Sequence, residues 1–246
     1  MKLVTRHLAH AGLCAALAMV SYGASAQDQG GDGAHSHPFK LTVGYYQYQD
    51  DEGKDINLRW QHGDSHVWLG HYEEHAFGGQ DRVGADTSYE VTDGLSLQPS
   101  VQAATGGFVG GSLNAQVGHA WYGLLGFGRT NLKPYFNLNF DPNDAITLGG
   151  GHQFDNGQNW SLFVIHDDRL HTGQTDWHLT ARIPVDADRL SLDLMRKSGD
   201  SDVGYIKAWA LSVTWDFPNW FVRLARDPKQ NFSANDTWRV SGGVRF

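Results

Sequence analysis

Histidines and carboxylates gather where two alternating segments of the sequence meet. His166 and Asp167 close the first segment, and Asp176 and His178 open the next. A histidine oriented by a carboxylate is the general-base unit of hydrolases that activate a serine or a water molecule. If the segments are neighbouring strands, these residues flank one loop and form a candidate catalytic site. No serine stands out beside them, so the favoured alternative is a solvated loop with weak local ion pairs.

A second group of polar residues has spacing that could bind a metal ion. His71, Glu73 and His75 alternate along the chain, which places their side chains on one face of a strand. Imidazole and carboxylate groups in this arrangement could hold zinc or copper. The favoured alternative is a hydrated rim of a loop. We therefore expect no resident metal and no cofactor.

Composition excludes several classes of protein. The 246 residues carry a net charge of -8, which argues against a nucleic-acid binder because such a protein needs a basic face. A mean hydropathy of -0.44 excludes a bundle of membrane-spanning helices. The single cysteine excludes a disulfide framework.

The first residues have the features of an export signal. Lys2 and Arg6 precede a short apolar run at 13–20, and an Ala-Ser-Ala cleavage pattern ends at Ala26. Residues 27–38 are rich in glycine and aspartate and have no periodicity, which predicts a flexible leader. The predicted organisation is a signal peptide at 1–26, a leader at 27–38 and one folded domain at 39–246.

The folded domain alternates apolar and polar residues to the end of the chain. Segments such as 209–217 and 238–246 place tryptophan, leucine, valine and phenylalanine on one face and polar or small residues on the other. This period of two predicts an all-β fold. Strands of about ten residues give about 14 strands, or 12 if the glycine-rich stretch at 105–140 is divided differently. The segment 132–154 predicts a strand, a turn around Pro142 and a returning strand.

Connection lengths and aromatic positions favour a closed membrane barrel over a soluble sandwich. Short turns alternate with longer loops, and tryptophan and tyrosine stand at strand ends, as in the aromatic girdles of outer-membrane barrels. The last strand ends on an aromatic residue, Phe246. In these features the chain resembles bacterial single-chain outer-membrane β-barrels. The resemblance implies that lipid and lipopolysaccharide surround the protein, and that Phe246 is the signal read by the barrel-assembly machinery.

Within that class, the size and texture of the chain loosely resemble the YaiO-type barrels, which are associated with exopolysaccharide export, and more loosely the small acidic-sugar porins. No motif matches residue by residue. The resemblance therefore assigns no functional residue.

Alternation places charged residues of both signs on the polar face of the strands. Because an unpaired buried charge is costly, these residues must pair across strands or face a wet lumen. The predicted function is a pore or export channel for ions or small polar solutes such as saccharides. The alternatives are a hydrolase acting at the rim or a non-conducting structural barrel. The predicted lumen-lining residues are Arg59, Arg82, Asp86, Glu90, Asp176, Arg182, Asp193, Arg223 and Arg239.

Overall fold

The computed structural model describes residues 37–136, 138 and 141–246. The predicted signal peptide and all but the last two residues of the predicted leader lie outside the described residues. Within these residues, one 3-10 turn, η1 (Gln230–Phe232), stands among strands and their connections. The strands are β1 (Phe39–Gln47), β2 (Glu52–His62), β3 (Ser65–Glu74), β4 (Gly78–Thr87), β5 (Tyr89–Thr92), β6 (Leu95–Ala104), β7 (Phe108–Gly118), β8 (Trp121–Thr130), β9 (Ala145–Gln153), β10 (Asn159–Asp167), β11 (Thr175–Val185), β12 (Asp188–Gly199), β13 (Ile206–Asp216), β14 (Trp220–Asp227) and β15 (Thr237–Arg245).

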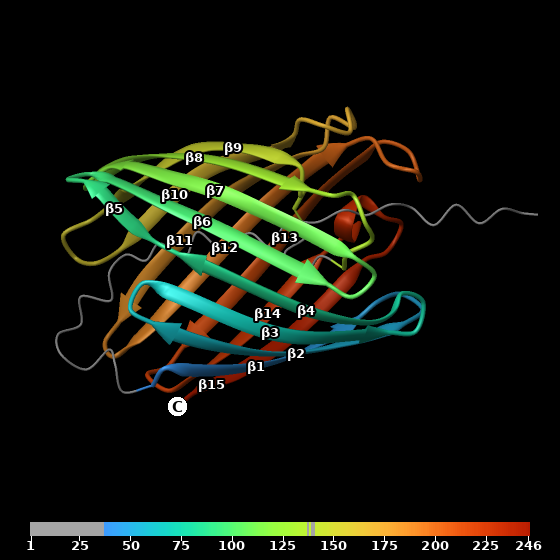
Figure 1. The fold of residues 1–246 in the computed structure, drawn as a ribbon, viewed down its shortest axis with the longest axis horizontal. Coiled ribbons are helices and arrows are strands. Elements are labelled where there is room, and N and C mark those ends of the chain that lie inside the picture. The colour runs from blue at the N-terminus through green and yellow to red at the C-terminus, as the bar shows by residue number, and fades with distance from the viewer. Residues whose placement is uncertain (1–36, 137, 139–140) are drawn as a thin grey trace, which may run out of the picture.

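The strands form a closed antiparallel barrel (Figure 1). Neighbouring strands along the chain pair with one another, and β15 returns to pair with β1. Both β4 and β5 pair with β6, and the partners Asp86↔Ser100 and Glu90↔Ser96 share one register. The segments β4 and β5 are therefore one strand interrupted at Ser88. This makes the barrel 14-stranded, which confirms the predicted fold and the larger of the two predicted strand counts.

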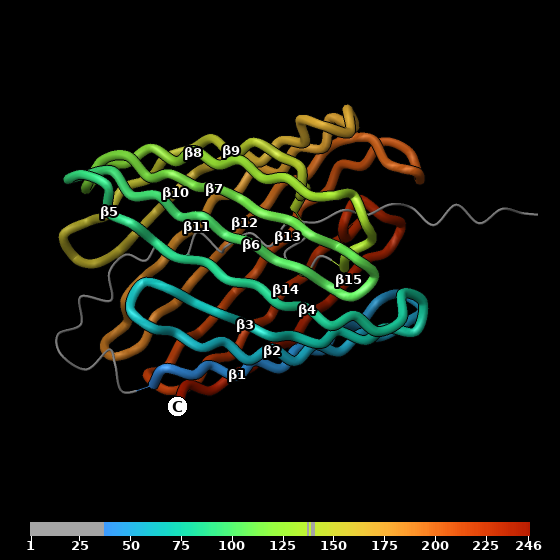
Figure 2. The backbone as a smooth tube through the Cα atoms, in the orientation of Figure 1, coloured from blue at the N-terminus to red at the C-terminus, as the bar shows by residue number. Residues whose placement is uncertain are grey.

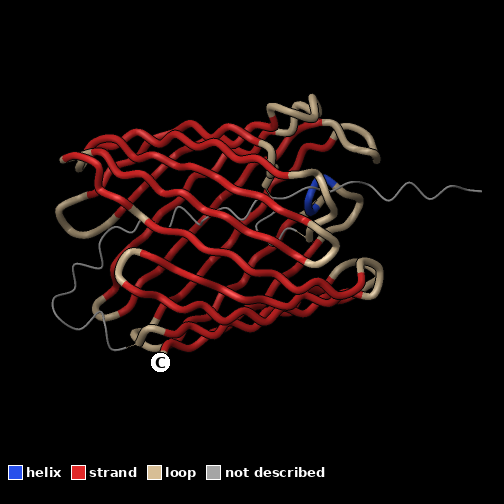
Figure 3. The backbone as a smooth tube through the Cα atoms, in the orientation of Figure 1, coloured by secondary structure: helices blue, strands red, loops and turns tan. Residues whose placement is uncertain are grey.

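The two ends of the barrel differ in their connections. The first and last strands, β1 and β15, lie side by side, and their free ends share one mouth, here called the terminus end (Figure 2). Turns at this end are mostly of two or three residues, as at 63–64, 119–120 and 217–219. The long connections at 131–144, 168–174 and 228–236 all lie at the opposite mouth, the loop end, beside η1 (Figure 3). Two short turns, 75–77 and 105–107, also lie at the loop end.

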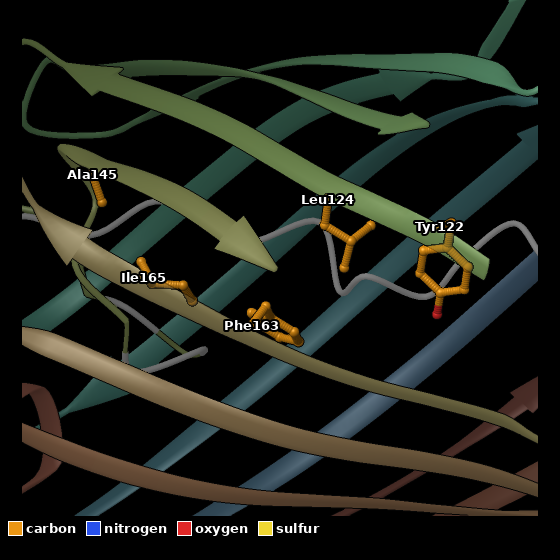
Figure 4. Packing of buried hydrophobic residues seen from close by; sticks show 5 residues of the cluster. All are labelled: Tyr122, Leu124, Ala145, Phe163 and Ile165. Atoms are coloured by element: carbon orange, nitrogen blue, oxygen red, sulfur yellow. The ribbon is translucent and has the colours of Figure 1, made fainter. Parts of the chain in front are cut away.

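The two faces of the wall have opposite chemistry. Large apolar side chains are exposed on the outside, as with Leu69 and Trp209, each 59% exposed. Inward positions carry most of the buried polar and charged residues, together with small apolar clusters. One cluster projects inward from β8, β9 and β10 (Figure 4) and consists of Tyr122, Leu124, Ala145, Phe163 and Ile165. This distribution is that of a lipid-facing barrel with a polar interior. Among the described residues, no helix is long and apolar enough to cross a membrane.

The strand predicted between Leu132 and the turn around Pro142 is absent from the described residues there, although the returning strand is present as β9. Strand β8 ends at Thr130, and the described residues that follow have no strand partner until an isolated bridge at Pro142. Leu132 turns the chain with a φ of 59°, and Pro134 lacks the N–H that a sheet ladder requires. The chain turns away from the wall here because its backbone groups bond to inward side chains instead of to a neighbouring strand.

Candidate functional site: a segment across the lumen

The connection between β8 and β9 enters the barrel. Its described residues, 131–136, 138 and 141–144, are here called the lumen segment. The ring of Phe136 stacks on Tyr72 of β3, with the ring centres 3.8 Å apart. Tyr135 stacks on Phe108 of β7 at 4.2 Å. These two stacks bury the aromatic residues of the segment against the wall formed by β3 and β7.

A glutamine side chain supports the same end of the segment. The Gln80 amide on β4 donates to the Pro134 carbonyl at 3.2 Å and accepts from the Phe136 N–H at 2.9 Å. One amide therefore satisfies two backbone groups that have no sheet partner. Backbone groups away from water require such partners. The Gln80 side chain thus supplies hydrogen bonds that a neighbouring strand would otherwise supply.

The other end of the segment is held on the far side of the barrel. Asp141 accepts a hydrogen bond from His178 of β11, Nε2 to Oδ1, at 2.8 Å. The second ring nitrogen of His178 lies 3.0 Å from Asp193 of β12. Arg239 of β15 donates to the Leu138 carbonyl at 2.7 Å. Seven pairings separate β3 from β11 in the order β3-β2-β1-β15-β14-β13-β12-β11. The anchors are therefore diametrically opposite, and the segment spans the lumen.

Ion pairs fix the base of the segment at the loop end. Arg169 bonds both the Asp144 carboxylate and the Thr130 carbonyl, at 2.7 and 2.8 Å. Nearby, Arg129 forms a bidentate ion pair with Asp168, with N–O distances of 2.7 and 2.6 Å. This bond from Arg129 holds the pKa of the Asp168 carboxyl below its ordinary value. The two connections at 131–144 and 168–174 are thereby joined.

Cations concentrate on one side of the inner wall, toward the terminus end. Lys40 pairs in register with Arg59 on β2 and with Arg245 on β15. Arg245 and Arg189 share Asp216, at 2.7 and 3.3 Å. Within the described residues, Lys40, Arg59 and Arg223 form no ion pair with a carboxylate. On the facing strands β6 and β7, many inward positions carry neutral polar residues: Gln98, Ser100, Gln102, Ser112, Asn114 and Gln116.

The predicted lumen residues all fall on the inward face of their strands. Arg82 pairs with Asp55, and Asp86 pairs with His66 at 2.8 Å. Asp176 is completely buried. Glu90 follows the strand interruption and is exposed near the terminus end. The remaining predicted positions are Arg59, Arg182, Asp193, Arg223 and Arg239, all half-buried.

The four candidate catalytic residues, which the sequence analysis weighed against a solvated loop, do not lie together. His166 points outward and bonds the Thr175 hydroxyl at 2.7 Å, whereas His178 lies inside the barrel. Successive strand residues face opposite sides of a sheet, so His166 and its neighbour Asp167 are separated by the wall. Asp167 accepts bonds from the Thr172 hydroxyl and from the backbone of the 168–174 loop. Asp176 is inside the barrel with His178.

The candidate metal ligands His71 and Glu73 share the outward face of β3, and His75 follows the end of that strand. His71 faces outward and lies 2.7 Å from Asp81 of β4. In the part of the chain that the structure describes, no three histidine, cysteine or carboxylate groups are placed to hold a metal ion. Tyr135, Phe136 and Asp141 of the lumen segment, and also Lys40, were not among the predicted site residues. Pro134, which cannot donate to a sheet ladder, was the signal in the sequence.

Comparison with known proteins supports the fold. The outer membrane protein Omp33 of Acinetobacter baumannii has a structure similar to this one, with a TM-score of 0.56 and 10% sequence identity. The similarity covers 85% of this chain and 98% of that one. The KdgM porin is similar at a TM-score of 0.48 and 9% identity, covering 84% and 99% of the two chains. No family model and no curated protein matches the sequence.

Proposed function

We propose that the protein is an outer-membrane pore for small polar solutes and that it favours anions. The observation that carries this proposal is the group of inward cations without carboxylate partners, Lys40, Arg59 and Arg223. Arg223 donates to the Thr214 hydroxyl at 2.8 Å, and Lys40 lies 4.4 Å from the centre of the Phe221 ring. Neither neutral partner balances a charge, and a charge buried in a dry interior costs several kcal/mol unless it is paired, so we expect water or an anionic solute beside these cations. A water-filled lumen with one cationic wall attracts anions and repels cations.

The apolar outer wall supports the location of the pore. A wall of exposed valine, leucine and tryptophan would aggregate in water and is stable in hydrocarbon. The similarity to Omp33, whose name places it in an outer membrane, is consistent with this location. In the expected orientation the terminus end faces the periplasm and the loop end faces outward.

The lumen segment favours small solutes over polymers. A chain fixed to opposite walls divides the cross-section and limits the size of what can pass. The resemblance to YaiO-type barrels suggests the alternative of exopolysaccharide export, which requires a wider path. Swelling of liposomes in sugars of increasing size separates the two. Entry of monosaccharides alone supports a small-solute pore, and entry of long oligosaccharides supports export.

The decisive experiment is a single-channel recording. Residues 27–246, refolded and inserted into a planar bilayer, should give discrete current steps, and a salt gradient should give a reversal potential of the sign for anion preference. A silent bilayer with correctly folded protein would overturn the pore. Steps with cation preference would overturn the role of the cationic wall.

We also propose that Phe246 serves barrel assembly. Its ring stacks on Phe39 at 5.7 Å, and its backbone bonds that of Phe39 at 3.0 Å, across the seam between β1 and β15. Deleting Phe246 should lower the yield of folded barrel in cells. An unchanged yield would show that folding in cells requires neither the contact between Phe39 and Phe246 nor recognition of Phe246 by the assembly machinery.

A further inference from the structure

The outer wall carries a groove of about 710 Å³ over β8, β9 and β10. Outward-facing residues form aligned rows across these strands. Trp121, His152 and Trp160 form one row, and Gly123, Gly150 and Leu162 form the next row toward the loop end. Because the two glycines have no side chains, the surface drops between the aromatic row and the leucines beyond it. The floor of the groove is therefore backbone at Gly123 and Gly150, and its sides are aromatic and leucine side chains.

The polar groups that line the groove are satisfied from inside the barrel, with one exception. The Tyr122 hydroxyl bonds Asn159, and the Ser161 hydroxyl bonds Thr180, each at 2.7 Å. The imidazole of His152 lies between Trp121 and Phe154, with ring centres at 4.2 and 4.3 Å. Its Nδ1 is buried and has no hydrogen-bond partner among the described residues. Because Nδ1 is enclosed by the protein, Nε2 is the ring nitrogen that a ligand in the groove could reach.

These features match an amphiphile with an apolar chain and a hydrogen-bonding end. Water does not occupy an apolar hollow that offers it no partners, and the surrounding solvent at this wall is hydrocarbon. Tryptophan side chains mark the level where lipid tails meet head groups. His152 lies in that aromatic row, on the terminus side of the groove.

We propose that this groove binds a glycerophospholipid from the leaflet at the terminus end. One acyl chain lies over Gly123 and Gly150, and the His152 imidazole hydrogen-bonds an ester or phosphate oxygen through Nε2. The lipid is a structural ligand of the outer wall. This inference depends on the membrane location of the barrel and is independent of whether the lumen conducts.

Substitution of Gly123 tests the groove directly. A Cβ added at Gly123 meets nothing closer than 3.9 Å, whereas one at Gly150 would lie 2.8 Å from the Tyr122 carbonyl oxygen. Gly123→Leu therefore fills the groove without disturbing the wall. Ala103→Leu, on the outward face of β6, adds a larger apolar side chain outside the groove and is the matched control.

Lipid retention is measured by native mass spectrometry of barrel extracted from membranes in mild detergent, with phosphatidylethanolamine added as the probe. We expect the wild type and Ala103→Leu to retain one lipid, and Gly123→Leu to bind it about tenfold more weakly, the effect of losing roughly two buried methylene groups. His152→Ala should weaken retention without filling the groove. It therefore keeps the test informative if Gly123→Leu does not fold.

Two results would overturn the proposal. The first is equal lipid retention by the wild type, Gly123→Leu and His152→Ala. The second is a wild-type dimer that Gly123→Leu converts to monomer, because a second copy would then occupy the groove. Conductance of the same samples is read separately, so a silent pore with bound lipid rejects the proposed function alone.

Discussion

His178 and Tyr72 hold one segment of the chain from opposite sides of the barrel. The Asp141 carboxylate bonds His178 at 2.8 Å, and the Phe136 ring stacks on Tyr72 at 3.8 Å, only five residues earlier in the chain. A segment that is held at both ends across the barrel cannot swing about one end as a free loop does. Its mobility therefore depends on each anchor separately.

Loss of the hydrogen bonds from His178 should make the lumen segment more mobile. His178→Ala removes charge-assisted hydrogen bonds of about 1.5–3 kcal/mol, which raises the population of the released segment by about 10- to 100-fold. Single-channel records should show larger or noisier open currents, and His178→Gln, which keeps a donor, should be intermediate. His166→Ala, on the outward face of β10, is the control. Identical records for His178→Ala and His166→Ala would contradict the anchor.

Neutralising the cationic wall should reduce anion preference. Arg59→Gln and Arg223→Gln should each lower the anion-to-cation permeability ratio about twofold or more, the factor for a unit charge about 8 Å away in water. The reversal potential in a salt gradient measures this ratio. Arg196→Gln, which faces outward on β12, should leave it unchanged. A shift of equal size in Arg196→Gln would show that the effect is not one of the lumen.

Acid should weaken the ion pair that attaches the 168–174 connection to β8. The pKa of Asp168 is lowered by its bond from Arg129, so the folded state favours the ionised carboxyl. The stabilisation is complete above the unfolded-state pKa and is lost as the pH falls through the lower folded-state value. The temperature at which the barrel unfolds in SDS should fall in this acidic range. Asp168→Asn should flatten the dependence, and Asp202→Asn, in the connection 200–205, should not.

Glycine is required at one inward position of β9. A Cβ at Gly149 would lie 2.3 Å from the Cβ of Phe163, so Gly149→Ala forces the wall apart and should cost about 1–3 kcal/mol. The same substitution at Gly123 meets open space. Thermal unfolding in detergent should separate the two variants. Equal stability would mean that β9 and β10 adjust freely at this point.

Alternation was sufficient to predict the barrel because each strand has one lipid face and one lumen face. Parity along a strand fixes the face, and Arg59, Arg182 and Arg239 lie on the inward side, whereas their role in lining an open lumen stays a prediction. It could not predict which charges pair, because Arg82 and Asp55 lie on β4 and β2, and the strand between them separates them in sequence. The hypothesis that His166 and His178 meet rested on the loop that they flank and not on parity, and the two residues lie on opposite faces.

The position of the lumen segment could not be predicted from the residues of the segment alone. Tyr135 and Phe136 resemble strand residues in type, and nothing near them in sequence indicates Phe108 or Tyr72 as partners. Their position is decided by contacts with β3, β4 and β7, which become visible only when the barrel closes. The turn residues Pro134 and Leu132 mark where the strand ends but not where the chain goes next.

The contact between Phe39 and Phe246 has a consequence for protein engineering. Since β1 and β15 are neighbours in the wall like any other pair, the closed barrel has no privileged first strand. A short peptide joining residues 39 and 246, with new ends opened in the 200–205 connection, should preserve every pairing. The strand pairing of the folded barrel thus does not depend on which strand comes first in the chain. If the rearranged chain fails to assemble in cells, the order of strands matters for insertion into the membrane and not for the folded structure.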